Sequence, residues 1–198
     1  MNITTPEKIS LSHTLCFMFS GKAGVGKSYC SDNLQNICDT EFKLKTFKSP
    51  LATGVKDTAR FMGWSGQKDK RGRVLLQKIG YAGREYDEDL WVRETFNRVD
   101  EYAGFPYDAI FIDDWRFKNE IDYVKKNEIL YKVVAIRIEA PGREILWGTS
   151  EYNDISETEL DNYDDFDYIL PNHMNDTDKL KQKLQVILLS EIKKYSIK

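Results

Sequence analysis

The sequence contains little cysteine or histidine and no long apolar run. Its three cysteines, Cys16, Cys30 and Cys38, show no C-x-x-C spacing, so we expect buried, reduced thiols rather than disulfides or a metal site. The two histidines, His13 and His173, lie far apart and do not suggest a zinc site. No stretch approaches about 18 consecutive apolar residues, and the first residues lack the pattern of a signal peptide. We therefore expect a cytoplasmic protein that does not enter a membrane.

An excess of positive charge is also missing. The chain carries 29 Lys and Arg residues against 32 Asp and Glu residues, which gives a net charge of −3. This balance argues against a protein that binds nucleic acid over a broad surface. Aromatic residues, in contrast, are plentiful, with four Trp, eleven Tyr and ten Phe, which excludes a disordered chain. The length of 198 residues suits one α/β domain with a substantial core.

One glycine-rich segment, residues 21–28, reads GKAGVGKS and fits the pattern G-x-x-x-x-G-K-[ST] of a phosphate-binding loop. An apolar run precedes it and a helical pattern follows it, which is the order needed to aim backbone N–H groups at a phosphate chain. We expect Lys27 to reach the β- and γ-phosphates of ATP, and the Ser28 hydroxyl to ligate Mg²⁺. The residues that we expect to bind ATP are Gly21, Ala23, Gly24, Val25, Gly26, Lys27, Ser28 and Tyr29.

Strand patterns alternate with helix patterns along the chain, which predicts a parallel sheet covered on both faces. The fold class is therefore α/β, namely a P-loop NTPase fold of three layers with a five-stranded parallel sheet. The expected strands are 14–19, 43–47, 107–112, 132–138 and 166–170. The expected helical segments are 28–38, 52–102 with a loop at about 63–72, 119–127 and 176–195. We expect a single domain, with a core at 13–50 and 105–195, a helical substrate-binding insertion at about 51–104 and a lid at about 141–165.

Two aspartates, Asp113 and Asp114, end the apolar strand at 107–112. P-loop proteins place a carboxylate beside Mg²⁺ in this way, although aspartate is also common in simple strand-end turns. Arg116 follows and suits either a phosphate or a structural ion pair. The residues to which we assign catalytic roles are Lys27, Asp114, Arg116 and Arg143, and the expected metal ligands are Ser28, Asp113 and Asp114.

A second group of polar residues has helical spacing. Arg73, Gln77, Gly80 and Arg84 are separated by four, three and four residues and can share one helix face. Such a face suits a small anionic substrate with a hydrogen-bonding base, and a solvated helix side is the alternative interpretation. Arg143 follows the strand at 132–138, where a mobile segment can close over ATP or simply form a surface loop.

Four runs of the sequence together resemble the phage-type deoxynucleoside monophosphate kinases. They are RVLLQKIGYAGR at 73–84, DLWV at 89–92, DWRFKNE at 114–120 and DYILPN at 167–172. The resemblance spans roughly residues 14–188, with the motifs in the family's order, and it departs from the family at Trp115, where a small or β-branched residue is usual.

This resemblance implies transfer of the γ-phosphate of ATP to a deoxynucleoside 5′-monophosphate, with Mg²⁺ as cofactor. It also implies a possible homodimer and, for a chain of phage origin, the host cytoplasm as its location. Arg143 would belong to the lid. The residues placed at the monophosphate pocket are Phe47, Lys48, Arg73, Gln77, Gly80, Arg84 and Trp91.

Other activities remain open at this point. A related small-molecule kinase acting on phosphomevalonate or dephospho-coenzyme A would share the loop and the arginine-rich pocket. A P-loop switch or ATP-driven binding protein would hydrolyse ATP slowly and hold a partner. A nucleic-acid 5′-kinase is disfavoured by the acidic net charge and the small size.

Overall fold

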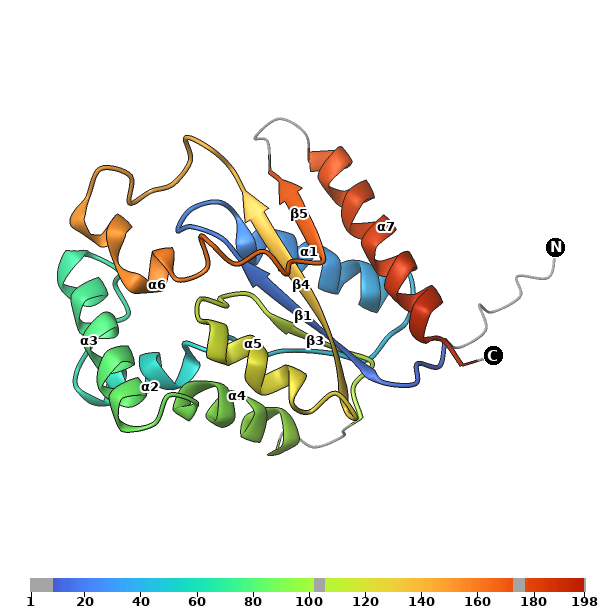
Figure 1. The fold of residues 1–198 in the computed structure, drawn as a ribbon, viewed down its shortest axis with the longest axis horizontal. Coiled ribbons are helices and arrows are strands. Elements are labelled where there is room, and N and C mark those ends of the chain that lie inside the picture. The colour runs from blue at the N-terminus through green and yellow to red at the C-terminus, as the bar shows by residue number, and fades with distance from the viewer. Residues whose placement is uncertain (1–8, 102–105, 173–176, 198) are drawn as a thin grey trace.

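The computed structural model describes residues 9–101, 106–172 and 177–197, and its centre is one parallel sheet (Figure 1). The strand order is β2-β3-β1-β4-β5. The strands are β1 (Thr14–Ser20), β2 (Thr46–Lys48), β3 (Ala109–Ile112), β4 (Tyr131–Glu139) and β5 (Tyr168–Pro171). Every residue of the central strand β1 is buried, which explains why its sequence is almost continuously apolar instead of alternating.

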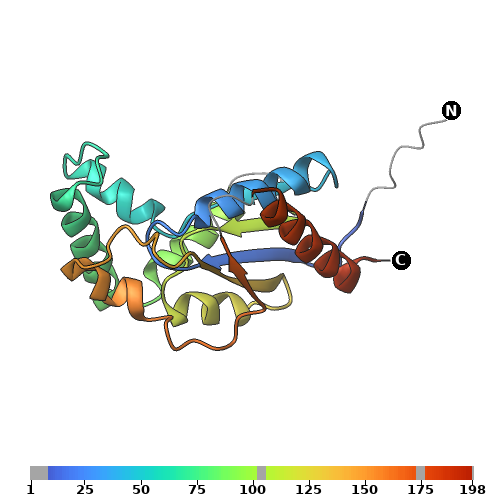
Figure 2. The same ribbon diagram turned by 90° about the horizontal axis from the view of Figure 1, so that it is seen from above.

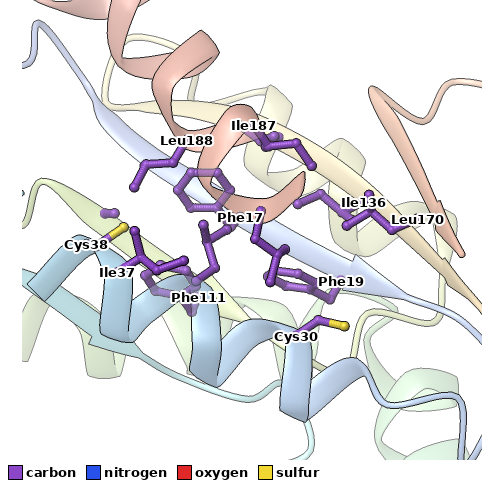
Figure 3. Close-up of a cluster of buried hydrophobic side chains, with 14 of the residues drawn as sticks. Phe17, Phe19, Cys30, Ile37, Cys38, Phe111, Ile136, Leu170, Ile187 and Leu188 are labelled. Carbon is purple, nitrogen blue, oxygen red and sulfur yellow. The ribbon is translucent and has the colours of Figure 1, made fainter. Parts of the chain in front are cut away.

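Helices cover both faces of the sheet (Figure 2). Side chains of α1 (Lys27–Thr40) and α7 (Thr177–Tyr195) form one core with the sheet, and the close-up of this core shows Phe17 and Phe111 beneath Ile187 (Figure 3). Side chains of α4 (Leu90–Glu101) and α5 (Lys118–Lys125) form a second core with the opposite face. Residues of β1 point alternately into the two cores, so the sheet is buried between two helical layers.

The remaining helices stand beyond the carboxyl ends of the strands, at one end of the molecule in both views (Figures 1 and 2). Their bounds are α2 (Thr53–Phe61), α3 (Lys70–Tyr86), the 3₁₀ helix η1 (Ser150–Asn153) and α6 (Ile155–Thr158). A small separate core joins α2, α3 and α4. The Tyr81 hydroxyl on α3 donates to Asp154 at 2.5 Å, just before α6. The segment 140–167 between β4 and β5 therefore reaches across to α3.

Five strands in parallel confirm the predicted fold class, although several boundaries differ from the predictions. The helical pattern predicted over 52–102 is three helices, and β2 begins three residues later than predicted. The reason for the late start is that the Lys45 N–H donates to the Asp108 side chain at 2.7 Å instead of joining the ladder. The predicted boundaries at 102, 105 and 176, and His173, lie outside the described residues.

All three cysteines are buried and free, as expected. Among the described residues, no helix is both long and apolar enough to cross a membrane.

Candidate active site

The glycine-rich segment forms the turn between β1 and α1, at the carboxyl edge of the sheet. Gly26, the residue before α1, has φ 96°, a left-handed conformation that favours glycine. A Cβ on Gly26 would overlap the side-chain nitrogen of Asn172, so a larger residue does not fit there. The loop thus ends directly at the N-terminus of α1, where unpaired backbone N–H groups and the helix dipole favour a bound anion.

Lys27 lies folded over this loop and is only 9% exposed. Its ammonium group donates to the carbonyl oxygens of Gly21 at 2.7 Å and Lys22 at 2.9 Å. Burial, and next the nearby charge of Arg116, lower the pKa of Lys27 from 10.5 to about 7. A bound polyphosphate would restore a counter-charge to this lysine, which is the environment expected for a phosphate-binding residue.

Asp113 directly follows β3, and its side chain faces the loop. Its carboxylate accepts a hydrogen bond from Ser28 and pairs with Lys48 at 2.8 Å. Burial alone would raise the pKa of Asp113, but the hydrogen bonds from Lys48 and Ser28 outweigh burial and hold that pKa below its usual value. Ser28 and Asp113 therefore form a pair of oxygen donors at the start of α1, of the kind that Mg²⁺ prefers.

Asp114 makes different contacts. Its two carboxylate oxygens accept from the backbone N–H groups of Leu51 at 2.7 Å and Ala52 at 3.0 Å, immediately before α2. Burial and the neighbouring charge of Asp113 raise the pKa of Asp114. This carboxylate thus fixes where the helical region begins, whereas Asp113 faces Ser28.

A cavity of about 540 Å³ opens between the loop, α3 and the segment 140–167. It brings together most of the residues singled out in the sequence, from both the ATP set and the substrate set. Those that line it are Ala23, Gly24, Gly26, Lys27, Ser28, Tyr29, Arg73, Gln77, Gly80, Arg84, Trp91, Asp113, Asp114 and Arg116.

One wall of this cavity is one side of α3. Arg73, Gln77, Gly80 and Arg84 all lie on it, as their spacing predicts. The Trp91 indole donates to the Gly80 carbonyl at 3.0 Å, which fixes the ring against α3. Burial lowers the pKa of Arg84.

Two lysines that the sequence analysis did not place in the site, Lys56 and Lys68, add to the positive charge of the cavity wall. Lys68 lies two residues before α3, and burial, Lys56 and Arg73 lower its pKa. Lys56 lies on α2, and no motif in the sequence marks it. The lining also holds three glutamates, Glu120 on α5, Glu151 in η1 and Glu157 on α6.

Five residues from the predicted site do not line the cavity. Gly21 and Val25 are buried, and Val25 packs into the core beneath α1 and α7. Phe47 stacks on Tyr107, with ring centroids 5.1 Å apart, because both rings pack into the core beside β3. Lys48 and Arg143 are the other two. Lys48 pairs with Asp32 at 2.6 Å as well as with Asp113, and the Arg143 guanidinium donates to the Asn172 carbonyl at 3.1 Å.

The segment 140–167, predicted as a lid, lies directly against the loop. The Ile145 N–H donates to the Ala23 carbonyl at 3.1 Å, and the Ala23 N–H donates to the Glu157 carboxylate at 2.8 Å. Arg116 forms an ion pair with the same Glu157 and donates to the Ser156 carbonyl at 2.7 Å. Arg116 was predicted to bind either a phosphate or a structural carboxylate. In the structure it lines the cavity and also forms an ion pair with a carboxylate.

The parallel sheet, with the glycine-rich loop between its central strand and α1 and an aspartate at the end of β3, is the fold of a P-loop NTPase. No family model matches the sequence.

Two curated relatives come from Ictalurid herpesvirus 1 (strain Auburn). The uncharacterized protein ORF77 is 31% identical over 152 residues, which are 77% of this chain and 61% of that protein. The uncharacterized protein ORF76 is 30% identical over 148 residues, 73% of this chain and 56% of that protein. The chain therefore spans about three fifths of the length of these relatives.

Two solved structures are similar in overall arrangement. The crystal structure of APE1195 is 14% identical with a TM-score of 0.48, over 92% of this chain and 98% of that one. Shikimate kinase from Acinetobacter baumannii in complex with shikimate is 11% identical with a TM-score of 0.47, over 91% and 95%. The sheet and the loop of this chain, and not these two likenesses, establish its fold.

Proposed function

We propose that this protein is a kinase that transfers the γ-phosphoryl group of ATP to a deoxynucleoside 5′-monophosphate, giving the diphosphate and ADP. The observation that carries the proposal is the single cavity shared by the phosphate-binding loop and the polar face of α3. A kinase has to hold a phosphoryl donor and an acceptor in one space that excludes water. The motif resemblance of α3 and α4 to the phage-type kinases supports the choice of acceptor.

The charges of the cavity suit an acceptor that carries a phosphate. Lys56, Lys68, Arg73 and Arg84 line the cavity from α2, from α3 and from the segment between these helices. Gln77 presents an amide on the same face, a group that can donate to and accept from a nucleobase. The Trp91 ring adds a flat apolar surface beside it, which suits stacking.

An acceptor phosphate needs no general base, because its attacking oxygen is already anionic at neutral pH. The tasks left to the protein are alignment and neutralisation of charge. Lys27 and the backbone N–H groups of the loop would hold the donor phosphates, and Arg116, which lines the same cavity, would neutralise the transferred group. Each of these groups would align or neutralise a phosphate without exchanging a proton. A site built from a loop and helix faces suits that task.

The residues present fit a magnesium ion. Ser28 and Asp113 would hold it, and the ion when bound would neutralise charge on the transferred group. In the described part of the chain, no cluster of three or more His, Cys, Asp or Glu side chains could hold a metal ion by itself. The other ligands would therefore be oxygens of the nucleotide and of water.

The decisive experiment is a coupled assay of ADP release with Mg-ATP. It would screen all ribonucleoside and deoxynucleoside monophosphates, with phosphomevalonate and dephospho-coenzyme A alongside. Stimulation by particular deoxynucleotides would support the proposal and identify the base. Slow ATP hydrolysis that no acceptor stimulates would refute it and favour a P-loop switch.

A matched pair of variants on α3 tests the acceptor wall. Gln77→Ala removes the amide that faces the cavity, whereas Lys78→Ala changes the exposed neighbour. We expect Gln77→Ala to raise the KM for the monophosphate about tenfold, since a site built for a hydrogen bond is left unpaired, and to leave the KM for ATP unchanged. Lys78→Ala should change neither constant.

A further inference from the structure

The phosphate-binding loop already holds an anion that belongs to the protein. The Glu157 carboxylate on α6 accepts from the Ala23 N–H of the loop at 2.8 Å and forms an ion pair with Arg116. Its side chain is only 5% exposed. A backbone N–H of a phosphate loop together with an arginine is a site that binds phosphate oxygens. Here a carboxylate occupies it.

The helix that carries Glu157 is held on both sides of the cavity. Asp154 caps α6 by accepting from the Ser156 N–H at 2.9 Å, and it also accepts from the Tyr81 hydroxyl of α3 at 2.5 Å. On the other side, the Lys22 ammonium group of the loop donates to the Glu157 carbonyl at 2.7 Å. The position of the carboxylate is therefore fixed by contacts to the acceptor wall and to the loop.

The Glu157 carboxylate lies between the loop, which it contacts at Ala23, and the α3 side of the cavity. Arg116 directly precedes Phe117, whose ring lies 3.9 Å from the guanidinium carbon of Arg84 on α3. A group bound to both Ala23 and Arg116 would thus contact the loop and border the acceptor wall. A phosphoryl group in transfer has to satisfy the same condition, because it bridges donor and acceptor.

We propose that Glu157 occupies the place of the γ-phosphate of ATP and keeps Arg116 neutralised until ATP displaces it. The inference rests on the proposed function in one respect, since it takes the loop to bind ATP. Two anions cannot share the Ala23 N–H and Arg116, so ATP binds with its full contacts only after Glu157 has moved away. ADP lacks the γ-phosphate and leaves Glu157 in place. Glu157 is therefore a positioning residue that lowers the preference of the site for ATP over ADP.

The test is a comparison of two nucleotides by calorimetry, using the full chain with Mg²⁺. The probes are ADP and the non-hydrolysable analogue β,γ-imido-ATP. The variant Glu157→Gln keeps the size of the side chain and removes its charge. Glu159→Gln, two residues along the chain, is the matched control, because none of the described contacts links Glu159 to the loop or to Arg116.

We expect Glu157→Gln to bind the ATP analogue about tenfold more tightly than the wild type, as the loss of a charge-assisted contact predicts, with ADP affinity within about twofold. Glu159→Gln should match the wild type with both nucleotides. Unchanged affinity for the ATP analogue, or an equal gain for both nucleotides, would overturn the inference. A purely structural role for Glu157 would shift both affinities together.

A second variant covers the case in which Glu157→Gln does not fold. Glu157→Asp keeps the charge but is one methylene shorter, so it cannot hold both Ala23 and Arg116, and we expect a gain in the same direction. Binding of these two nucleotides needs no acceptor. Failure of the kinase assay with every monophosphate would therefore leave this result standing, and failure here would leave the proposed function untouched.

Discussion

Asn172 donates a side-chain N–H to the carbonyl oxygen of Val25 at 2.7 Å. The residue that follows β5 therefore fixes the backbone of the phosphate-binding loop. The contact is buried, since Asn172 is 6% exposed. The Asn172 backbone N–H in turn donates to the Glu139 carbonyl at 2.8 Å, which anchors the contact to the end of β4. The shape of the loop therefore depends on a residue far away in the sequence.

This contact predicts the effect of Asn172→Ala. The variant leaves the Val25 carbonyl without its partner beside the loop, and a buried neutral hydrogen bond contributes about 0.5–1.5 kcal/mol. We expect ATP affinity, measured by calorimetry, to fall about five- to tenfold as the loop loses its fixed shape. Asn127→Ala is the control, because Asn127 donates to the Tyr123 carbonyl at 3.0 Å on the exposed surface. ATP affinity equal to that of the wild type in Asn172→Ala would contradict this account.

The two adjacent aspartates predict two different defects. Asp113 contacts Ser28, whereas Asp114 holds the backbone of Leu51 and Ala52 at the start of α2. We expect Asp113→Asn to lower kcat about 100-fold and to raise the Mg²⁺ concentration needed for half-maximal activity, because the carboxylate that we propose as a metal ligand loses its charge. Asp114→Asn should mainly raise the KM for the acceptor. Steady-state kinetics over a range of Mg²⁺ concentrations separate the two, and equal Mg²⁺ dependence in both variants would argue against the assignment.

The sequence was most informative where a contact is local or periodic. Residues 21–28 are contiguous, so the order of strand, loop and helix could be predicted, and the spacing of Arg73, Gln77 and Arg84 placed them on one face of α3. Asn172 could not be given its role in this way, because its contact to Val25 joins residues 147 positions apart.

Other misses have similar physical causes. No motif in the sequence marks Glu157, which reaches the loop because Asp154, and not Glu157, caps α6. Phe47 was placed in the substrate pocket by resemblance, but an aromatic ring can equally stack in a core, as it does here on Tyr107. Lys56 enters the cavity only because α2 packs on α3.

The lowered pKa of Lys27 predicts that ATP binding takes up a proton. In the free protein this pKa is about 7, against 10.5 for an ordinary lysine, so at pH 8 the amine is mostly neutral. Bound phosphates would favour the charged form and raise the pKa again. We expect uptake of close to one proton at pH 8 and much less at pH 6, measured by calorimetry in buffers of different ionisation enthalpy.

Lys27→Met should abolish this uptake, and Lys78→Met, on the exposed side of α3, should retain it. The same shift affects stability. Between about pH 7 and pH 10.5 the unfolded chain binds more protons at Lys27 than the folded protein does, so this group makes stability rise with pH in that window. Proton uptake that persists in Lys27→Met would assign the titration to another group.

Gly83 on α3 predicts a packing defect with a specific kinetic consequence. A Cβ at this position would lie 2.5 Å from Cε2 and 2.6 Å from Nε1 of Trp91, closer than any real contact, and the ring is held by the Gly80 carbonyl. Alanine normally stabilises a helix by about 0.5–1 kcal/mol relative to glycine, but overpacking costs about 1–3 kcal/mol. We therefore expect Gly83→Ala to lower the Tm by a few degrees.

The same variant should raise the KM for the acceptor and leave ATP affinity unchanged, because Trp91 lines the cavity beside α3, where we propose that the acceptor binds. Gly80→Ala is the matched comparison on the same helix. Its Cβ would meet the end of the flexible Arg84 side chain at 2.9 Å, which can move aside, so the gain in helix propensity should keep the Tm at or above the wild-type value. If Gly83→Ala were as stable as Gly80→Ala, the Trp91 ring would be free to shift, and a rigid stacking surface for the nucleobase could not be maintained.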